Sequence, residues 1–348
     1  MAHNLFIFNS KLKISKSLIQ IIIALLTFIV LNMMIVKIGP YFDSNYATME
    51  NVNDESWIKG GDYLFLGDSR GHQGLVPAEF SAAMKQHGQD VSAINLARPG
   101  MQIPFAYYFS KRVTENATTP PKAVIVNFSF YLLGGMQWMK DIYFSYYRPS
   151  LSEAYHSCIS MLQTCSDAAI WYAKTRIPAW MFRKRANDFL KRTLIGSPQS
   201  LLGQLNGMYE IKQLLDFDVA QGYLNRGASH IDSSDIQPHG YGLNIDNGYS
   251  IYYKYLDLML TELAAKNIDV YVYRFPWPEA RQNEEGFQEV LDHYWSKIKT
   301  GNREGSSIHF LDDVYFWPNE YFVDPLHLNH AGATRLTKTI AEKISETQ

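Results

Sequence analysis

Short apolar runs alternate with amphipathic stretches over two parts of this chain. The apolar runs, bounded by polar or turn-forming residues, predict strands at 62–66, 91–95, 123–126, 270–273 and 308–311. The amphipathic stretches predict helices at about 78–87, 103–115, 250–265, 284–299 and 330–345. Strands that alternate with helices are typical of a parallel sheet with right-handed crossovers. We therefore expect an α/β fold with a five-stranded parallel sheet.

A longer apolar run near the N-terminus is of a different kind. Leu18 to Val36 is a stretch of 19 residues that only three polar residues interrupt. At about 1.5 Å per residue it is just long enough to cross a hydrocarbon core of roughly 30 Å. No small-residue cleavage site follows it, which favours an uncleaved transmembrane helix. Lys11, Lys13 and Lys16 precede the run and Lys37 alone follows closely, so we expect the N-terminus in the cytoplasm.

These patterns divide the chain into consecutive segments. Residues 1–17 form a cytoplasmic tail, 18–36 the membrane anchor and 37–60 a linker. The α/β domain is expected to consist of 61–130 and 247–348. Between its two parts, 131–246 is a large insertion of mainly helical character that ends in a loop rich in Gly, Asn and His.

Composition narrows the function classes. Hydrophobic content of 47% and charged content of 19% are ordinary for a globular protein. A formal net charge of −2 argues against a nucleic-acid-binding protein, which usually has a basic excess. Outside the cytoplasm Cys158 and Cys165 can close a small disulfide loop, which we prefer to two unpaired thiols. Their surroundings do not have the spacing of a zinc site, and the irregular His and Asp residues over 230–239 predict a loop.

The candidate chemistry begins where the first strand ends. The strand 62–66 runs directly into Gly67-Asp68-Ser69, which places a hydroxyl at the carboxyl edge of the sheet, where α/β proteins bind ligands. A serine needs a general base to act as a nucleophile. Asp324-Pro-Leu-His327 offers both a base and a carboxylate that orients it. Asp68 is interpreted as a carboxylate that accepts hydrogen bonds from amides of the turn, with no chemical role.

Together, Gly67-Asp68-Ser69 and Asp324-x-x-His327 resemble the SGNH/GDSL hydrolase superfamily of esterases and acyltransferases. The wording of Leu66-Gly-Asp-Ser-Arg70, Asn95-Leu-Ala-Arg-Pro-Gly100 and His327-Leu-Asn-His-Ala-Gly-Ala333 is similar to its membrane-anchored branch. That branch includes the D-alanyl transfer protein of teichoic-acid decoration and the alginate acetylation proteins. The resemblance spans roughly 60–130 and 250–346 and implies a flavodoxin-like SGNH fold.

The resemblance also implies a catalytic triad. Ser69 would be the nucleophile, His327 its base, and Asp324 the residue that fixes the imidazole tautomer. The alternative is that Ser69 is a turn residue and that His327 caps the last helix. The backbone amides of Ser69 and Gly100 would stabilise the oxyanion.

The family has a third oxyanion donor, an asparagine side chain, but this sequence departs from the family in the block that contains it. The family has Gly-x-Asn-Asp at this point, whereas this strand runs Val126-Asn-Phe-Ser-Phe. Asn127 is either an oxyanion donor or a hydrogen-bonding residue of the core, and Ser129 competes with it for the first role.

Basic residues near the expected site are candidates for substrate binding. Arg70, Arg98 and Arg274 all fall near the carboxyl edge of the sheet and can bind an anionic or polar acceptor, although arginines are common at surface turns. His72 and His330 are expected in loop or capping roles. Within the insertion, 174–192 is basic and rich in aromatic residues, and either lies on an anionic membrane or forms a solvated helix face.

The expected function is that of a membrane-anchored serine acyltransferase or esterase. It would act through an acyl-serine intermediate on O-acyl groups of a cell-envelope or exported polysaccharide, with no cofactor or metal. We expect a bacterial inner-membrane protein with its catalytic domain in the periplasm. The resemblance implies a multispanning membrane O-acyltransferase as a partner. The alternatives are a plain membrane-tethered esterase or lipase, and a non-catalytic envelope scaffold or carbohydrate-binding subunit.

Overall fold

The computed structural model describes residues 16–42, 61–117, 119–128, 147–160, 165–177, 180, 227–229, 250–300, 307–312 and 316–347. Its helices are α1 (Lys16–Phe42), α3 (Ser69–Gly74), α4 (Pro77–Gln86), α5 (Ile103–Asn116), α7 (Leu151–Ser160), α8 (Cys165–Lys174), α12 (Ser250–Ala265), α13 (Phe287–Lys299) and α14 (His330–Thr347). Its strands are β1 (Tyr63–Leu66), β2 (Ala93–Asn95), β3 (Ala123–Phe128), β4 (Asp269–Arg274), β5 (Trp277–Pro278), β6 (Ile308–Leu311), β7 (Phe316–Trp317), β8 (Phe322–Asp324) and β9 (His327–Leu328). Two short 3₁₀ helices, Glu279–Arg281 and Asn319–Tyr321, complete the described elements.

The main sheet has five strands in the order β2-β1-β3-β4-β6, and every neighbouring pair is parallel. The prediction of a five-stranded parallel sheet in an α/β fold is therefore confirmed. From β1 the chain goes to β2 on one side of it. It then crosses back over β1 to form β3 on the other side. This reversal makes the carboxyl ends of β1 and β3 the point at which such sheets bind ligands.

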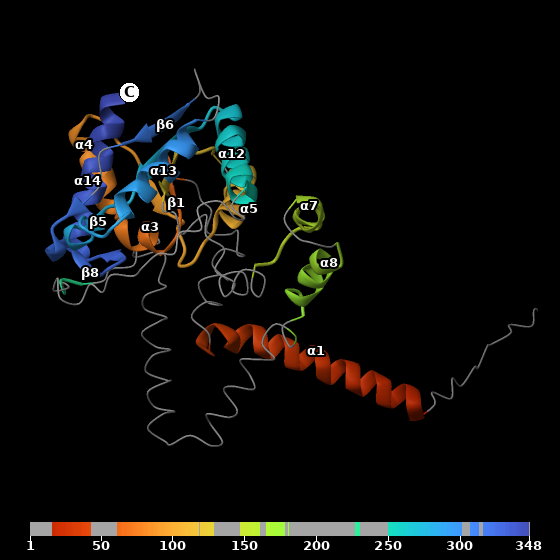
Figure 1. Ribbon diagram of the computed structural model, residues 1–348. Helices are drawn as coiled ribbons and strands as arrows, with labels where there is room; N and C mark the ends of the chain where they lie inside the picture. Colours follow the sequence, from red (N-terminus) through yellow and green to blue (C-terminus); the bar gives the residue numbers. More distant parts are fainter. Residues whose placement is uncertain are drawn as a thin grey trace, which may run out of the picture.

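Successive side chains along each strand point to opposite faces of the sheet and pack into two separate hydrophobic cores. Leu64, Val124 and Val270 belong to one cluster, to which α5, α12 and α13 contribute. Residues one position further along each strand, such as Phe65 and Ile125, belong to the other, with α4 and α14. Figure 1 shows α4 with α14 on one side of the sheet and α5 with α12 on the other. Because both faces are covered, the strands read as continuous apolar runs.

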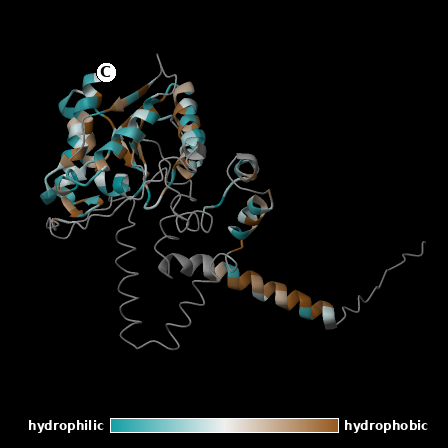
Figure 2. Cartoon of the chain, in the orientation of Figure 1, coloured by the Kyte–Doolittle hydropathy of each residue, from teal (hydrophilic) through white to brown (hydrophobic). Residues whose placement is uncertain are grey.

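The helix α1 contains a long apolar stretch. Within it, Ser17–Met34 has a mean hydropathy of 2.3, and none of this window is buried against the rest of the chain. Figure 2 shows this stretch in brown. Its length and composition suit either a membrane span or a signal sequence. The helix continues to Phe42, beyond the predicted span of 18–36, and ends two residues after Pro40, which lacks an amide hydrogen.

The insertion predicted at 131–246 is described only in part. Helices α7 and α8 pack against each other, and a disulfide joins Cys158 to Cys165, which confirms the preference for a bonded pair. Trp171 of α8 packs edge-on against Phe105 of α5, so the pair of helices rests on the α/β domain. Most of the basic stretch 174–192, the His and Asp residues over 230–239, Ser129 and the linker residues 43–60 lie outside the described residues.

Candidate active site

Three side chains from two distant parts of the chain form a continuous line of hydrogen bonds. The Oγ of Ser69 lies 2.8 Å from Nε2 of His327, and Nδ1 of His327 lies 2.8 Å from Oδ2 of Asp324. When Nδ1 donates its proton to the carboxylate, Nε2 is left to accept the hydroxyl proton. This tautomer is inferred from the hydrogen bonds. The arrangement has the geometry of a nucleophile, a base and an orienting acid.

A tight hairpin sets the spacing of the acid and the base. Strands β8 and β9 are antiparallel, and Asp324 pairs directly with His327 across a two-residue loop. The Oδ1 of Asp324 also accepts a hydrogen bond of 2.9 Å from the amide of Leu326, as in an Asx turn. The acid–x–x–His spacing therefore follows from local backbone geometry. The capping residue of α14 is Asn329, whose Oδ1 accepts from the amide of Gly332 at 3.0 Å, and not His327 or His330.

Ser69 is the first residue of α3, a short helix that follows β1 almost without a connection. Asp68 caps this helix, because its Oδ1 accepts the amide of Arg70 at 2.9 Å. Its predicted role as a carboxylate of the turn is confirmed. The helix itself was not predicted, and His72 lies within it rather than in a loop. Gly67 has a φ of +148°, and a Cβ there would overlap the side-chain oxygen of Asn127.

Asn127 lies directly under the turn that carries Ser69. Its side chain is fully buried, and Nδ2 donates a hydrogen bond of 3.0 Å to Oδ1 of Asp68. A Cβ on Gly71 would also overlap its Oδ1, so two glycines leave room for this amide. Asn127 thus hydrogen-bonds in the core, as one of its two predicted roles requires. An oxyanion role for Asn127 stays a prediction.

The turn that contains Gly100 adjoins the nucleophile turn. The amide of Arg98 donates to the carbonyl of Gly67 at 3.0 Å, and Gly100 has a φ of +73° in the turn closed by Met101 donating to Arg98. A glycine tolerates this backbone conformation at the third position of a type II turn. The amides of Ser69 and Gly100 therefore come from two adjacent turns at the same sheet edge.

The three arginines predicted to bind substrate are buried side chains. Arg70, Arg98 and Arg274 are 3%, 3% and 5% exposed. Arg98 donates to two backbone carbonyls within the three residues before it, and Arg274 pairs with Asp292 at 2.8 Å. Nothing in these contacts supports substrate binding, which stays a prediction for each.

Arg70 links the helix that carries Ser69 to the hairpin that carries Asp324 and His327. Its Nε donates to the carbonyl of Leu326 at 3.3 Å, and its guanidinium lies 4.4 Å from the ring centre of Trp277. The helix of the serine is thereby attached to the hairpin of the histidine. The sequence offered no signal for this contact beyond the position of Arg70 next to the serine.

Asn95 is a second residue whose role the sequence did not reveal. It is fully buried at the end of β2, and its Nδ2 donates to the carbonyls of Gly71 and Leu75 at 2.9 and 2.8 Å. Gly71 lies within α3 and Leu75 follows its last residue, so Asn95 holds the C-terminal end of this helix against β2. Its place in the Asn-Leu-Ala-Arg-Pro-Gly block was the available signal.

Burial also affects a tyrosine beneath the site. Burial raises the pKa of Tyr273 well above its usual value, and the negative charge of Asp68 adds to this effect. Tyr273 therefore stays protonated in the neutral range. Within the described residues no group of three or more His, Cys, Asp or Glu side chains is arranged to hold a metal ion.

Comparison with protein-family models and with curated proteins finds no match to this chain. The resemblance to SGNH hydrolases therefore rests on the sequence motifs and stays a prediction.

Proposed function

We propose that this protein is a membrane-anchored serine enzyme that transfers or removes O-acyl groups on an extracytoplasmic polysaccharide. The observation that carries the proposal is the hydrogen-bonded line from Ser69 through His327 to Asp324, with 2.8 Å at each link. Its position at the carboxyl edge of a parallel sheet is the usual position of active sites in such folds. The strand order, 2-1-3-4-5 within the main sheet, is that of flavodoxin-like proteins and supports the SGNH resemblance.

The proposed reaction has two steps. Ser69 Oγ attacks the carbonyl carbon of an acyl ester, and its proton passes to Nε2 of His327. The C–O bond to the leaving alcohol breaks, and the alcohol takes that proton, which leaves an acyl-serine. A sugar hydroxyl or water then attacks the acyl-serine, gives its proton to His327, and releases Ser69 when the proton returns to Oγ. The amides of Ser69 and Gly100 are the proposed donors to the oxyanion of each step.

The anchor sets the proposed location. The helix Ser17–Met34 is long and apolar enough to span a bilayer, and the lysines before it favour an N-terminus in the cytoplasm. The α/β domain then lies in the periplasm, where a disulfide between Cys158 and Cys165 persists. The resemblance to alginate and teichoic-acid proteins supports a multispanning membrane O-acyltransferase as the donor partner.

The test compares hydrolysis with transfer. The full chain in neutral detergent is given p-nitrophenyl acetate, alone and with an oligosaccharide acceptor, and acetylated sugar is measured by mass spectrometry. The proposal predicts release of nitrophenol that Ser69→Ala and His327→Gln abolish. Acetyl groups on the acceptor identify a transferase, and release into water alone identifies an esterase. Equal release by the wild type and Ser69→Ala contradicts the proposal.

A further inference from the structure

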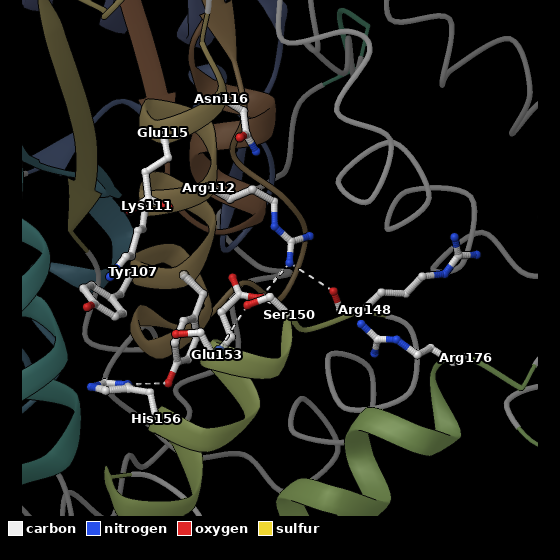
Figure 3. A pocket seen from close by; sticks show the side chains of 12 residues that line it. Tyr107, Lys111, Arg112, Glu115, Asn116, Arg148, Ser150, Glu153, His156 and Arg176 are labelled. Atoms are coloured by element: carbon white, nitrogen blue, oxygen red, sulfur yellow. Dashed lines mark hydrogen bonds and ion pairs between the residues drawn. The ribbon is translucent and has the colours of Figure 1, made fainter.

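A polar hollow lies between α5 and the disulfide-linked helices α7 and α8 of the insertion, and no residue of the triad lines it. Its volume is about 420 Å³, which is within the usual range of small-molecule sites. Figure 3 shows side chains around it from α5, from the segment before α7, from α7, and Arg176 just after α8. The described residues that line it are Tyr107, Tyr108, Lys111, Arg112, Glu115, Asn116, Arg148, Ser150, Ser152, Glu153, His156 and Arg176.

The lining is positively charged, although the whole chain has a formal net charge of −2. It contains four Lys or Arg residues and two glutamates. One of those glutamates, Glu153, is already neutralised within the protein. It pairs with Arg112 at 2.7 Å, accepts from the hydroxyl of Tyr147 at 2.7 Å, and forms a capping box with Ser150 at the start of α7. With this pair set aside, three cations, Lys111, Arg148 and Arg176, remain against one glutamate, so the charge left for a ligand is positive.

Lys111 supplies part of that charge. Among the described residues its ammonium group makes no hydrogen bond or ion pair, and its side chain is half-buried on α5. A cation in this position keeps its capacity to bind an anion.

The wall opposite α5 is held in a fixed shape. The disulfide joins α7 to α8, and Arg176 after α8 donates to the carbonyl of Pro149 at 2.6 Å. Arg112 on α5 donates to the carbonyl of Arg148 at 3.0 Å. The hollow is thus formed before a ligand arrives, which lowers the entropy cost of binding.

Neutral hydrogen-bonding groups accompany the cations. The hydroxyl of Tyr108 lies 2.8 Å from Nδ1 of His156, and the chain continues to the hydroxyl of Tyr255 at 3.1 Å. Partial burial, and then the charge of Lys111, lower the pKa of His156, so its imidazole is neutral at pH 7. Hydroxyl and amide groups of serines and Asn116 lie on the same lining. None of the described lining residues is aliphatic.

We propose that this hollow binds an acidic sugar unit of a polysaccharide, with its cations on the sugar carboxylate and its neutral groups on the hydroxyls. An anionic lipid fits less well, because the lining offers no aliphatic wall to an acyl chain. No residue of the triad lines the hollow, so binding of the sugar can be tested independently of the proposed catalysis.

The test measures binding by the full chain in a polyoxyethylene detergent, which contains no sugar. Tetragalacturonate is the probe, and maltotetraose, tetraglutamate, inorganic phosphate and phosphatidylglycerol vesicles are compared with it by calorimetry or flotation. We expect tetragalacturonate to bind more tightly than the other four, and its binding to weaken with added salt. Lys111→Met should weaken it about two- to fivefold, as loss of one partly exposed ion pair does. Lys85→Met on α4 is the matched control and should leave it unchanged, as should Ser69→Ala.

Several results overturn the proposal. They are absence of tetragalacturonate binding, binding that Lys111→Met leaves unchanged, and equal binding of tetraglutamate or phosphate, which would mean that only charge is recognised. Binding of the vesicles through Lys111 without binding of the sugar would assign the hollow to lipid. If Lys111→Met lowers the unfolding temperature, Arg148→Gln replaces it, because the hydrogen bond from Arg112 is made to the backbone carbonyl of Arg148, which this substitution keeps.

Discussion

Replacement of Asn127 by aspartate tests whether this side chain is a buried hydrogen-bonding residue of the core or an oxyanion donor. The side chain of Asn127 is fully buried and donates to Oδ1 of Asp68 at 3.0 Å. In Asn127→Asp, two carboxylates face each other at this distance in the core. Their repulsion at an effective dielectric of about 20 is about 5 kcal/mol, so the pair binds a proton rather than carry two charges.

The cost of that proton sets the size of the effect and its dependence on pH. An unfolded aspartate has a pKa of about 3.9, so protonating it at pH 7 costs about 4 kcal/mol, and at pH 5 about 1.5 kcal/mol. The folded variant holds one more proton than the unfolded variant across this range, so its stability falls as pH rises. The deficit relative to wild type should therefore grow by about 1.4 kcal/mol per pH unit between pH 5 and 7.

Thermal unfolding of the full chain in neutral detergent, followed by tryptophan fluorescence at pH 5, 6 and 7, measures this deficit. For a domain of this size about 4 kcal/mol corresponds to a lowering of Tm by roughly 8–16 °C. Asn127→Ala is the control, because it loses the hydrogen bond without adding a charge and its deficit should not depend on pH. If Asn127→Asp instead lowers the stability only slightly, and by the same amount at pH 5, 6 and 7, the side chain reaches water, as an oxyanion donor must.

Three further predictions concern other parts of the structure. Arg70→Lys removes the donor to Leu326 and should lower kcat for an ester reporter about tenfold with little change in KM, the size of one hydrogen bond; a rise in KM alone would instead indicate substrate contact. Reduction of the disulfide between Cys158 and Cys165 should cost about 2.5 kcal/mol of stability by the loop-entropy relation while Ser69 keeps its reactivity, and an unchanged Tm would refute this. Partial burial, and then a neighbouring lysine charge, lower the pKa of His156, so the unfolded state takes up its proton first. Wild-type stability should then fall as pH drops below about 6.5, and the slope should be shallower in His156→Gln; identical slopes would contradict the lowered pKa.

The sheet was predictable because its strands are covered on both faces and therefore read as unbroken apolar runs. The strand at 308–311 and the helix at 250–265 match the structure at both ends. Strand β3 continues two residues past the predicted end at Val126, because Asn127 is polar yet fully buried by its bond to Asp68. A buried polar residue breaks an apolar pattern although it does not break the strand.

The remaining elements depend on contacts between distant residues. Helix α3 has six residues and contains two glycines, which oppose helix formation. Asn95 from β2 donates to the carbonyls of Gly71 in this helix and of Leu75 just after it. The three arginines predicted at a binding surface lie inside the protein. The aromatic partner of Arg70, Trp277, and the ionic partner of Arg274, Asp292, are not neighbours in the sequence, so the burial of these two arginines could not be read from their own surroundings. By contrast, Asp324 and His327 are paired by a local hairpin, and their relation was readable from spacing alone.

Labelling with a fluorophosphonate shows whether Ser69 is a nucleophile, because this probe reacts far faster with an activated serine than with an ordinary one. The full chain, Ser69→Ala and His327→Gln are treated in parallel, and the modified peptide is identified by mass spectrometry. The account predicts a single adduct on Ser69 in the wild type, none in Ser69→Ala, and labelling slowed at least a hundredfold in His327→Gln. An unlabelled Ser69 in folded wild-type protein, or equal labelling without His327, would contradict it.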